Sequence, residues 1–329
     1  MTATRQAVVI FGEALIDEFP HQRVVGGAPF NVARTLAYFQ CVPLMISRIG
    51  NDPNAALIRN EVQRYALISG GIQTDMAHAT GRVVVTQDDS DDKTDHRFDI
   101  LRDQAYDHID AEAAFHVREY LYPDHHQGVL YFGTLAQRQT ASSEALQRLL
   151  TTTDALKYLD LNLRTGQYTP AVIEQSLYRA DILKINEEEL KMLSRLYLAG
   201  QISAPADDAT AEEFVPLLKL LITMFDLQVI IVTRGARGYV YLDRNAQLLS
   251  NGEHLIAVDV VDTVGGGDAF SAIFLLGLCR GWDTALSLQR AHQFAAAICG
   301  IRGAVPQNLD FYRSWQQQWN LPDLNEGMP

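Results

Sequence analysis

Short apolar runs alternate with amphipathic stretches along most of this 329-residue chain. The runs that predict strands are residues 8–11, 44–49, 129–132, 158–161, 182–185 and 229–233. The stretches between them that predict helices are residues 31–39, 54–65, 142–150, 171–178, 187–196 and 211–225. Since parallel strands must be joined by crossovers, this repetition predicts a doubly wound, mostly parallel α/β sheet with helices on both faces.

One segment departs from this alternation. Residues 81–87 and 96–102 have β-like patterns and bracket an aspartate-rich stretch, residues 88–95, which predicts a protruding hairpin. The aspartates are typical of a solvated loop. Residues 201–210 indicate a surface loop and not a linker, because the strand and helix pattern resumes directly afterwards.

Charge and cysteine content exclude several classes of protein. The chain carries 40 acidic and 27 basic side chains, a formal charge of −13, which disfavours binding to nucleic acid or to an anionic membrane. Three cysteines without a CxxC pair fit reduced thiols. The N-terminus lacks a secretory apolar region, and the longest apolar run, residues 269–279, is too short to span a bilayer. We therefore expect a cytoplasmic protein.

The sharpest chemical signal is a glycine-rich turn that leads directly into a helical run. Gly265, Gly266 and Gly267 precede Asp268, and residues 271–279 follow as a helix. Backbone N–H groups and the positive helix end predict an anion site suited to a phosphate. Asp268 would then be a general base beside that site. The alternative is a turn in which Asp268 only caps the helix.

A second signal lies near the front of the chain, after the first predicted strand. Ligands of a parallel sheet bind beyond the carboxyl ends of its strands. Gly26 and Gly27 allow close backbone approach, Pro29 suits a first helical turn, and Asn31 offers a donor and an acceptor to a polyol. Asp17 can accept hydrogen bonds from two hydroxyls. An ordinary loop-to-helix entry with a solvated Asp17 is the alternative.

Two further strand ends carry weaker signals. Asn186 and Glu189 are spaced to point the same way on a helix and to hold a hydrated Mg²⁺, although an Asn cap followed by acidic residues is also a routine helix start. Thr233, Gly235 and Gly238 follow the next strand and suit a nucleotide, with a plain β-turn as the alternative. The chain has neither a GxxxxGK[ST] motif nor GxGxxG after its first strand, which disfavours P-loop and standard NAD-binding proteins.

Taken in order, these motifs resemble the ribokinase-like (PfkB) family of sugar kinases, from about residue 8 to residue 306. Asp-Thr-Val-Gly-Gly-Gly-Asp-Ala-Phe, residues 262–270, is similar to the family's C-terminal signature, with Gly266 where Ala is more common. Within the family the chain is most similar to fructokinases, through residues 12–17, 26–33 and 160–164. The resemblance implies a single ribokinase-like domain, with a small β lid at about residues 18–26 and 78–104.

The resemblance also implies transfer of the γ-phosphoryl group of ATP to a primary hydroxyl of a sugar, with fructose ranked first. Asp268 would be the base and the N–H groups of Gly265–Gly267 would cradle the moving charge. The other implied roles fall into three groups: Asp17, Gly26, Gly27, Asn31 and Asn162 for the sugar, Arg164 for the phosphates or the sugar, and Arg97 and Phe98 for closing the lid. Asn186 and Glu189 would position Mg²⁺, and Thr233, Gly235 and Gly238 would bind the nucleotide.

Several features leave the acceptor and assembly open. The short segment 18–25 limits the lid through which some relatives dimerise, so the chain is expected to be a monomer or a homodimer. Residues 294–304 are shorter than the family's usual run, and Asp259 alone fits its monovalent-cation site, which makes K⁺ a further candidate cofactor. The alternatives to fructose are 2-keto-3-deoxygluconate, another hexose, ribose or a nucleoside. From another class, a non-catalytic nucleotide or sugar sensor would retain the same scaffold.

Overall fold

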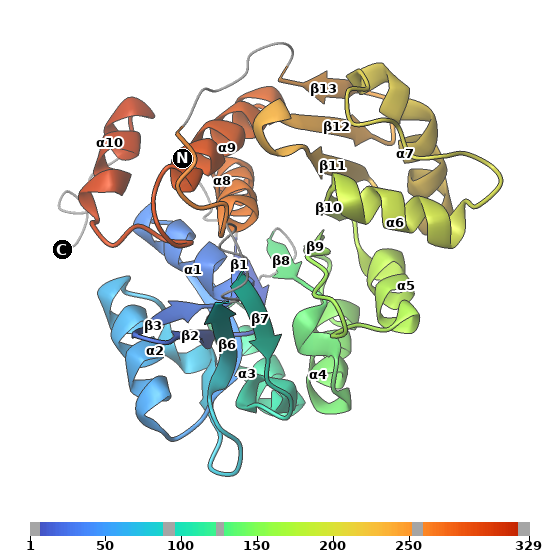
Figure 1. Ribbon diagram of the computed structural model, residues 1–329. Coiled ribbons are helices and arrows are strands. Elements are labelled where there is room, and N and C mark those ends of the chain that lie inside the picture. The colour runs from blue at the N-terminus through green and yellow to red at the C-terminus, as the bar shows by residue number, and fades with distance from the viewer. Residues whose placement is uncertain (1–6, 88–95, 123–127, 252–258, 322–329) are drawn as a thin grey trace.

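The computed structural model describes residues 7–87, 96–122, 128–251 and 259–321 (Figure 1). Its strands are β1 Val8–Phe11, β2 Leu15–Phe19, β3 Gln22–Gly26, β4 Pro43–Ile49, β5 Ile72–Thr74, β6 Gly81–Gln87, β7 His96–Ile100, β8 Val129–Phe132, β9 Leu156–Asp160, β10 Ile182–Asn186, β11 Val229–Thr233, β12 Tyr239–Asp243 and β13 Leu248–Ser250. Its α-helices are α1 Ala28–Tyr38, α2 Pro53–Arg64, α3 Ala111–Leu121, α4 Thr140–Thr151, α5 Pro170–Arg179, α6 Glu187–Tyr197, α7 Ala211–Phe225, α8 Gly266–Arg280, α9 Thr284–Cys299 and α10 Asp310–Gln318. The 3₁₀ turns are η1 Ser69–Gly71, η2 Ala105–His108, η4 Leu135–Gln137 and η5 Gly235–Arg237.

A nine-stranded sheet runs in the order β13-β12-β11-β10-β9-β8-β1-β4-β5. The strands from β11 to β5 pair in parallel, and β12 and β13 add an antiparallel edge. This confirms the predicted mostly parallel sheet. The antiparallel edge was not predicted. The prediction relied on strands that alternate with helices, whereas a tight turn joins β12 to β13.

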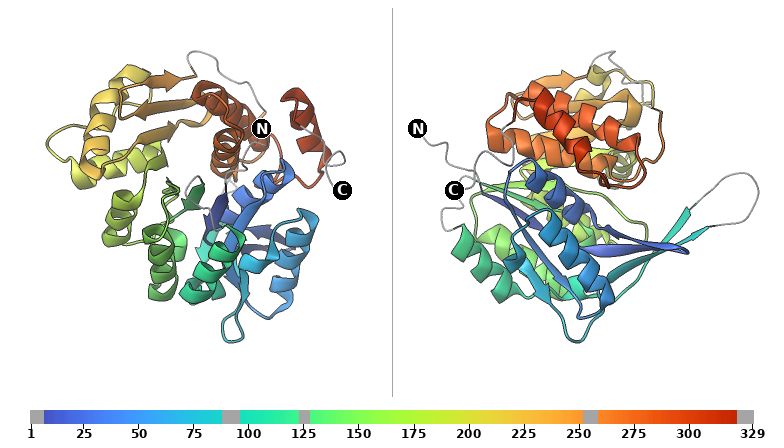
Figure 2. Two further views of the ribbon diagram at one scale, coloured as in Figure 1. Left: turned by 180° about the vertical axis from the view of Figure 1, so that it is seen from behind. Right: turned by 90° about the vertical axis from the view of Figure 1, so that its left-hand side faces the viewer.

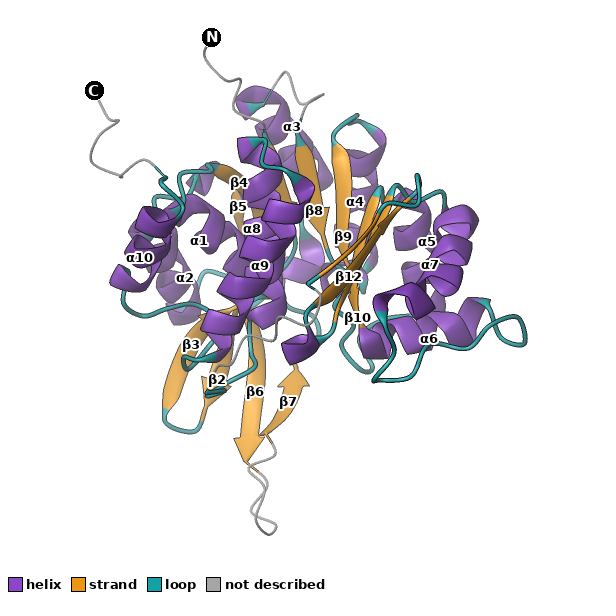
Figure 3. Cartoon of the chain, turned by 90° about the horizontal axis from the view of Figure 1, so that it is seen from above, coloured by secondary structure: helices purple, strands orange, loops and turns teal. Residues whose placement is uncertain are grey.

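Both faces of this sheet are buried, as the crossover helices require. In β1, Val8 and Ile10 pack into one hydrophobic cluster, while Val9 and Phe11 pack into the other. Helices α1, α8, α9 and α10 lie on one side of the sheet, and α4, α5 and α7 lie on the other (Figure 3). The strand ends between these two helical layers are where the site residues gather.

A second sheet of four strands, in the order β3-β2-β6-β7, projects from the body of the molecule (Figure 2). Strands β2 and β6 pair in parallel, with Leu15 opposite Gly81, while β3 and β7 flank them in antiparallel pairs. These strands occupy the segments expected for the lid, except that β2 already begins at Leu15. The aspartate-rich tip, residues 88–95, lies outside the described residues. Within the described ranges, no helix is long and apolar enough to cross a membrane.

Candidate active site

Asp268 lies in the first turn of α8, which begins at a glycine cap. Gly265 precedes the helix with φ of 81°, and the first helical hydrogen bond runs from the Ala269 N–H to the Gly265 carbonyl (2.8 Å). The Gly267 and Asp268 N–H groups therefore precede the helical ladder and face the helix end. The Asp268 side chain is buried, and its Oδ2 accepts a hydrogen bond from Asn31 Nδ2 at 2.7 Å. The structure thus joins the two strongest predicted motifs.

The glycines of this turn allow close approach from two directions. A Cβ at Gly265 would lie 2.4 Å from Ala304 Cα, so the loop after α9 packs directly against the turn. A Cβ at Gly267 would lie 2.9 Å from Lys184 Nζ, and one at Gly266 would lie 2.9 Å from Cys299 Sγ. Cys299 Sγ therefore occupies the space beside Gly266, the position at which Ala is more common in the family's signature.

Asn31 is held from its other side by a buried arginine. Arg34 donates from Nη2 to Asn31 Oδ1 at 2.6 Å and to the Val25 carbonyl at 2.9 Å. Its Nη1 pairs with Glu61 at 2.8 Å. Because Arg34 can only donate, Asn31 Oδ1 must face it, and the Asn31 amide N–H then faces Asp268. Arg34 was missed by the sequence analysis.

Asp17 lies beside the front diglycine. A Cβ at Gly26 would lie 2.3 Å from Asp17 Oδ2, and one at Gly27, where φ is 102°, would lie 2.5 Å from the Glu13 carbonyl. Burial raises the pKa of Asp17 to about 6, although Arg164 and Arg34 oppose this and Asp268 adds to it. Asp17, Arg164 and Asp268 therefore share one electrostatic environment.

A small pocket opens at the ends of β1, β8 and β9. Its lining includes Glu13, Pro29, Tyr131, Asn162 and Arg164. Burial raises the pKa of Glu13 to about 7, while hydrogen bonds from backbone N–H groups and the charge of Arg164 lower it. Asn162, at φ of 41°, and Arg164 thus reach the same region as the front motif. The pocket places a buried acid beside the predicted sugar residues.

A buried ion pair lies beneath the glycine turn. Lys184 Nζ contacts both Asp160 oxygens at 3.0 and 3.1 Å, and Ser271 donates to Asp160 Oδ2 at 2.8 Å. Burial raises the pKa of Asp268, the Asn31 hydrogen bond lowers it, Asp160 raises it, and Lys184 lowers it. The ion pair therefore acts directly on the expected base.

Asn186 and Glu189 form a capping box at the start of α6. The Glu189 N–H donates to Asn186 Oδ1, and the Asn186 N–H donates to Glu189 Oε2, each at 2.9 Å. Glu189 Oε1 accepts from the Leu163 N–H at 2.8 Å, which ties α6 to the segment that carries Asn162 and Arg164. Each oxygen keeps a further lone pair, so this donor set fits a hydrated Mg²⁺.

The predicted nucleotide loop is a turn at the end of β11. The Arg234 N–H bonds the Gly238 carbonyl at 2.7 Å, and Gly238 has φ of 87°. A Cβ at Gly238 would lie 1.8 Å from Asn251 Oδ1, so a side chain there would have to displace Asn251. Arg234 pairs with Glu187 at 3.0 Å, which connects Thr233, Gly235 and Gly238 to the start of α6.

The predicted lid residues lie on β7. Phe98 pairs with Val85 across the hairpin and leaves half of its side chain exposed, at 50%. Arg97 pairs with Thr86. The side chain of Arg97 lies outside the described residues.

No role was assigned from the sequence to four charged residues of this region, although Glu13 and Asp160 lie within the fructokinase-like segments: Glu13, Arg34, Asp160 and Lys184. Lys184 interrupts the apolar run of β10, and Asp160 ends the buried part of β9; a charged residue in a buried strand is rare unless it is paired. That pattern was a usable signal. Arg34 offered none, because a single arginine in an amphipathic helix is ordinary.

Comparison with known proteins shows the family. Residues 7–310 match the pfkB family carbohydrate kinases, and the chain belongs to that family. It is a fructokinase-like carbohydrate kinase. It is 29% identical to probable fructokinase-6, chloroplastic, of Arabidopsis thaliana, over 91% of this chain and 79% of that protein.

Solved structures show the same fold. The fructokinase of Xylella fastidiosa with bound ATP has a TM-score of 0.77 at 19% identity and covers 96% of this chain and 100% of that one. A double mutant of the Vibrio cholerae O395 fructokinase, with fructose, ADP and potassium ion bound, has a TM-score of 0.75 at 21% identity, covering 94% and 96%.

Proposed function

We propose that this kinase transfers the γ-phosphoryl group of ATP to a primary hydroxyl of fructose. The observation that carries the proposal is the burial of Asp268 at a glycine-capped helix start, 2.7 Å from Asn31 of the front motif. The choice of acceptor is supported by the similarity to proteins named as fructokinases. The choice of donor is supported by the likeness to a structure with bound ATP.

Asp268 takes the hydroxyl proton as the sugar oxygen attacks. Its raised pKa brings the carboxylate closer in basicity to an operating pH near neutrality. The charge on the transferring phosphoryl oxygens is stabilised by the N–H groups of Gly265–Gly267, at the positive end of α8. Base and anion site therefore act on neighbouring atoms of one transfer.

The front motif and the pocket orient the acceptor. Asp17, Asn31 and Asn162 offer hydrogen bonds to sugar hydroxyls, while Gly26 and Gly27 let the sugar approach the backbone. Arg164, which lines the pocket, would contact either the sugar or the phosphates. The four-stranded sheet, with Arg97 and Phe98 on β7, acts as the lid of a single kinase domain and excludes water.

The start of α6 and the turn after β11 serve the nucleotide. Thr233, Gly235 and Gly238 would bind ATP, and Asn186 and Glu189 would hold Mg²⁺. When bound, Mg²⁺ neutralises charge on the phosphates. The capping box keeps both side chains in a fixed position for this role.

A coupled ADP-release assay over fructose, ribose, 2-keto-3-deoxygluconate and a nucleoside tests the proposal, with and without K⁺. We expect the highest kcat/KM for fructose and a phosphomonoester on a CH₂OH carbon by NMR. A higher kcat/KM for another acceptor would overturn the choice of fructose. Binding of ATP and sugar without ADP release would overturn the kinase proposal and favour a sensor.

A further inference from the structure

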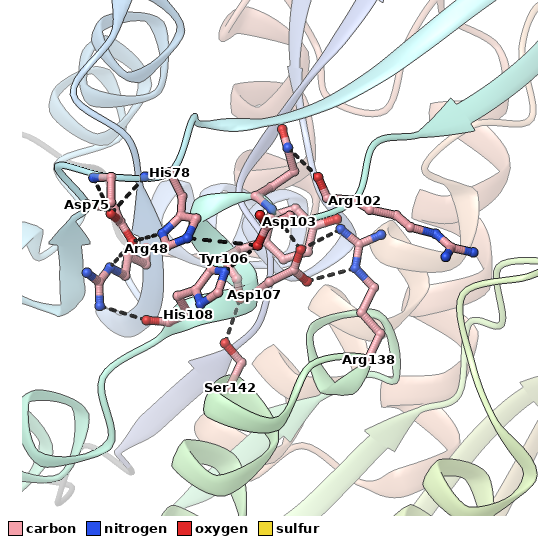
Figure 4. A network of polar contacts seen from close by, with 12 residues as sticks. Arg48, Asp75, His78, Arg102, Asp103, Tyr106, Asp107, His108, Arg138 and Ser142 are labelled. Atoms are coloured by element: carbon pink, nitrogen blue, oxygen red, sulfur yellow. Dashed lines mark hydrogen bonds and ion pairs between the residues drawn. The ribbon is translucent and has the colours of Figure 1, made fainter.

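A second polar cluster lies at the root of the four-stranded sheet, and the mechanism above does not use it (Figure 4). It consists of His78, Asp103 and His108. His78 lies in the connection between β5 and β6. Asp103 lies in the connection between β7 and η2, and His108 is the last residue of η2. The cluster therefore joins the two ends of one hairpin. We propose that these three side chains form a binding site for a divalent transition metal of the zinc class.

The donor atoms are already gathered. Asp103 Oδ1 lies 2.8 Å from His108 Nε2 and 3.8 Å from His78 Nε2, and all three ligand atoms lie within 4.8 Å of one another. A tetrahedral ion with bonds of about 2.0–2.2 Å separates its donors by roughly 3.4 Å. The observed separations lie on either side of that value, so small side-chain movements bring the donors to it.

The two imidazole rings are stacked, with centroids 3.7 Å apart and planes 12° apart. This places both rings on the same side of Asp103, but parallel rings do not aim their lone pairs at one point. Binding therefore requires the rings to splay. Both side chains are partly exposed, which leaves them room to do so.

His78 is prepared as a ligand by a carboxylate behind it. Its Nδ1 lies 3.0 Å from Asp75 Oδ2, and Asp75 also accepts the N–H groups of Ala77 and His78 and pairs with Arg48 at 2.8 Å. Because Asp75 is an acceptor, Nδ1 carries the hydrogen, and the Nε2 lone pair of neutral His78 faces Asp103. A cation between that lone pair and Asp103 would be held by both, and a carboxylate behind the histidine is typical of metal sites.

The donor set selects the kind of ion. Two imidazole nitrogens and one carboxylate oxygen suit Zn²⁺, Co²⁺ or Ni²⁺, whereas Mg²⁺ and Ca²⁺ prefer oxygen ligands. The site is therefore separate in chemistry from the Mg²⁺ that a kinase uses. A bound ion would link the chain before β6 to the chain after β7 and so stabilise the base of the lid sheet.

The test is a titration of the full chain, without nucleotide, with Zn²⁺ followed by calorimetry and with Co²⁺ followed by absorption spectroscopy. We expect one ion per chain, Co²⁺ bands free of sulfur charge transfer, and loss of the ring-stacking shifts in NMR. His78→Phe and His108→Phe keep two stacked rings but remove one ligand each, and should weaken Zn²⁺ binding at least about 100-fold. Asp75→Asn should weaken it about 10- to 100-fold. The matched control is His116→Ala, an exposed histidine on α3, which should bind as wild type.

Wild-type Zn²⁺ affinity in both His→Phe variants would overturn the proposal. A cobalt spectrum with thiolate bands would overturn it too, by assigning the ion to a cysteine. Absence of Zn²⁺ binding in the calorimetric titration up to millimolar concentration would also overturn the proposal. Asp103→Asn keeps the test decisive if a histidine variant misfolds, because Asn readily adopts the left-handed φ of 55° found there. It should weaken Zn²⁺ binding by at least tenfold.

Discussion

Helices α6 and α8 begin with the same local arrangement, an acid at the third helical position, but use it differently. At α6 the cap is Asn186, and Glu189 turns back to complete a capping box. At α8 the cap is Gly265, which has no side chain, and Asp268 instead bonds Asn31 from the other end of the chain. The residue at the cap therefore decides whether the acid serves its own helix or a distant partner.

The two acids also share a buried ion pair. Burial raises the pKa of both Glu189 and Asp268, while Lys184 lowers each and Asp160 raises each. Glu189 accepts two backbone N–H groups, whereas Asp268 accepts one side-chain amide. Both Glu189 oxygens therefore accept one backbone bond and keep only their second lone pairs, whereas more of the acceptor capacity of Asp268 remains for a ligand.

The largest effect is expected from Asp268→Asn, which keeps the shape of the α8 start and removes its base. Turnover should fall about 10²- to 10⁴-fold, or roughly 3 to 5 kcal/mol of barrier, with sugar affinity largely kept. Steady-state kinetics and sugar binding by calorimetry measure the two effects separately. Turnover within threefold of wild type would exclude Asp268 as the base.

Glu13→Gln extends the comparison to a buried acid on a strand end. The folded pKa of Glu13 is about 7, above its ordinary value of 4.5, so folding favours the protonated form. Stability from this group is present below pH 4.5 and is lost as pH rises to 7. Glutamine does not ionise, so the variant should be more stable than wild type by up to about 3 kcal/mol at pH 8 and by much less at pH 5.

Urea unfolding at both pH values measures this difference. Glu144→Gln, at an exposed position of α4, is the control and should leave the pH dependence of stability unchanged. An equal effect of Glu13→Gln at pH 5 and pH 8 would contradict the raised pKa.

The sequence predicted the central architecture because periodicity and local propensity agree there. The strand at residues 229–233 and the helix at 211–225 match the structure to the residue. Strands β2 and β3 were expected only through the family resemblance, as part of the β lid, since their own pattern mixes charged and apolar residues. Strand β3 pairs with β2, and β2 pairs in turn with β6, which is distant in sequence. Elements that are stabilised by non-local pairing carry little local signal.

The site was predictable where a motif fixes the backbone and was missed where tertiary contacts fix a side chain. The glycine turn and the diglycine are backbone features that can be read from the residue types. The path from Asp268 through Asn31 to Arg34 depends on α8 packing against α1, which no spacing encodes. The sequence left two roles open for Asn186 and Glu189, a Mg²⁺ site and a helix cap. The capping box itself became visible only in the structure.

Asn31→Asp tests how strongly the partner of Asp268 controls it. The substitution places a second carboxyl group at the 2.7 Å contact, and Arg34 favours its ionised form, so the proton moves to Asp268. The acid limb of the kcat/KM profile should shift upward by about one pH unit, so that activity on that limb falls about tenfold at a given pH. Asn31→Ala removes the hydrogen bond without adding charge and should lower activity without that shift. An unshifted profile in Asn31→Asp would show that Asp268 is not the titrating base.

The smallest effect is expected at α6, from Glu189→Gln. Glutamine has one acceptor oxygen, so it loses the bond from either Leu163 or Asn186, which should lower the free energy of unfolding by about 1 kcal/mol. Loss of the charge should also raise the Mg²⁺ concentration needed for half-maximal activity about threefold, with kcat at saturating Mg²⁺ within twofold of wild type. Glu188→Gln, on the exposed neighbour that pairs with Lys191, is the matched control and should change neither quantity. A loss of stability with an unchanged Mg²⁺ requirement would confine Glu189 to its capping role, whereas a large loss of kcat would mean that the starts of α6 and α8 share the catalytic work.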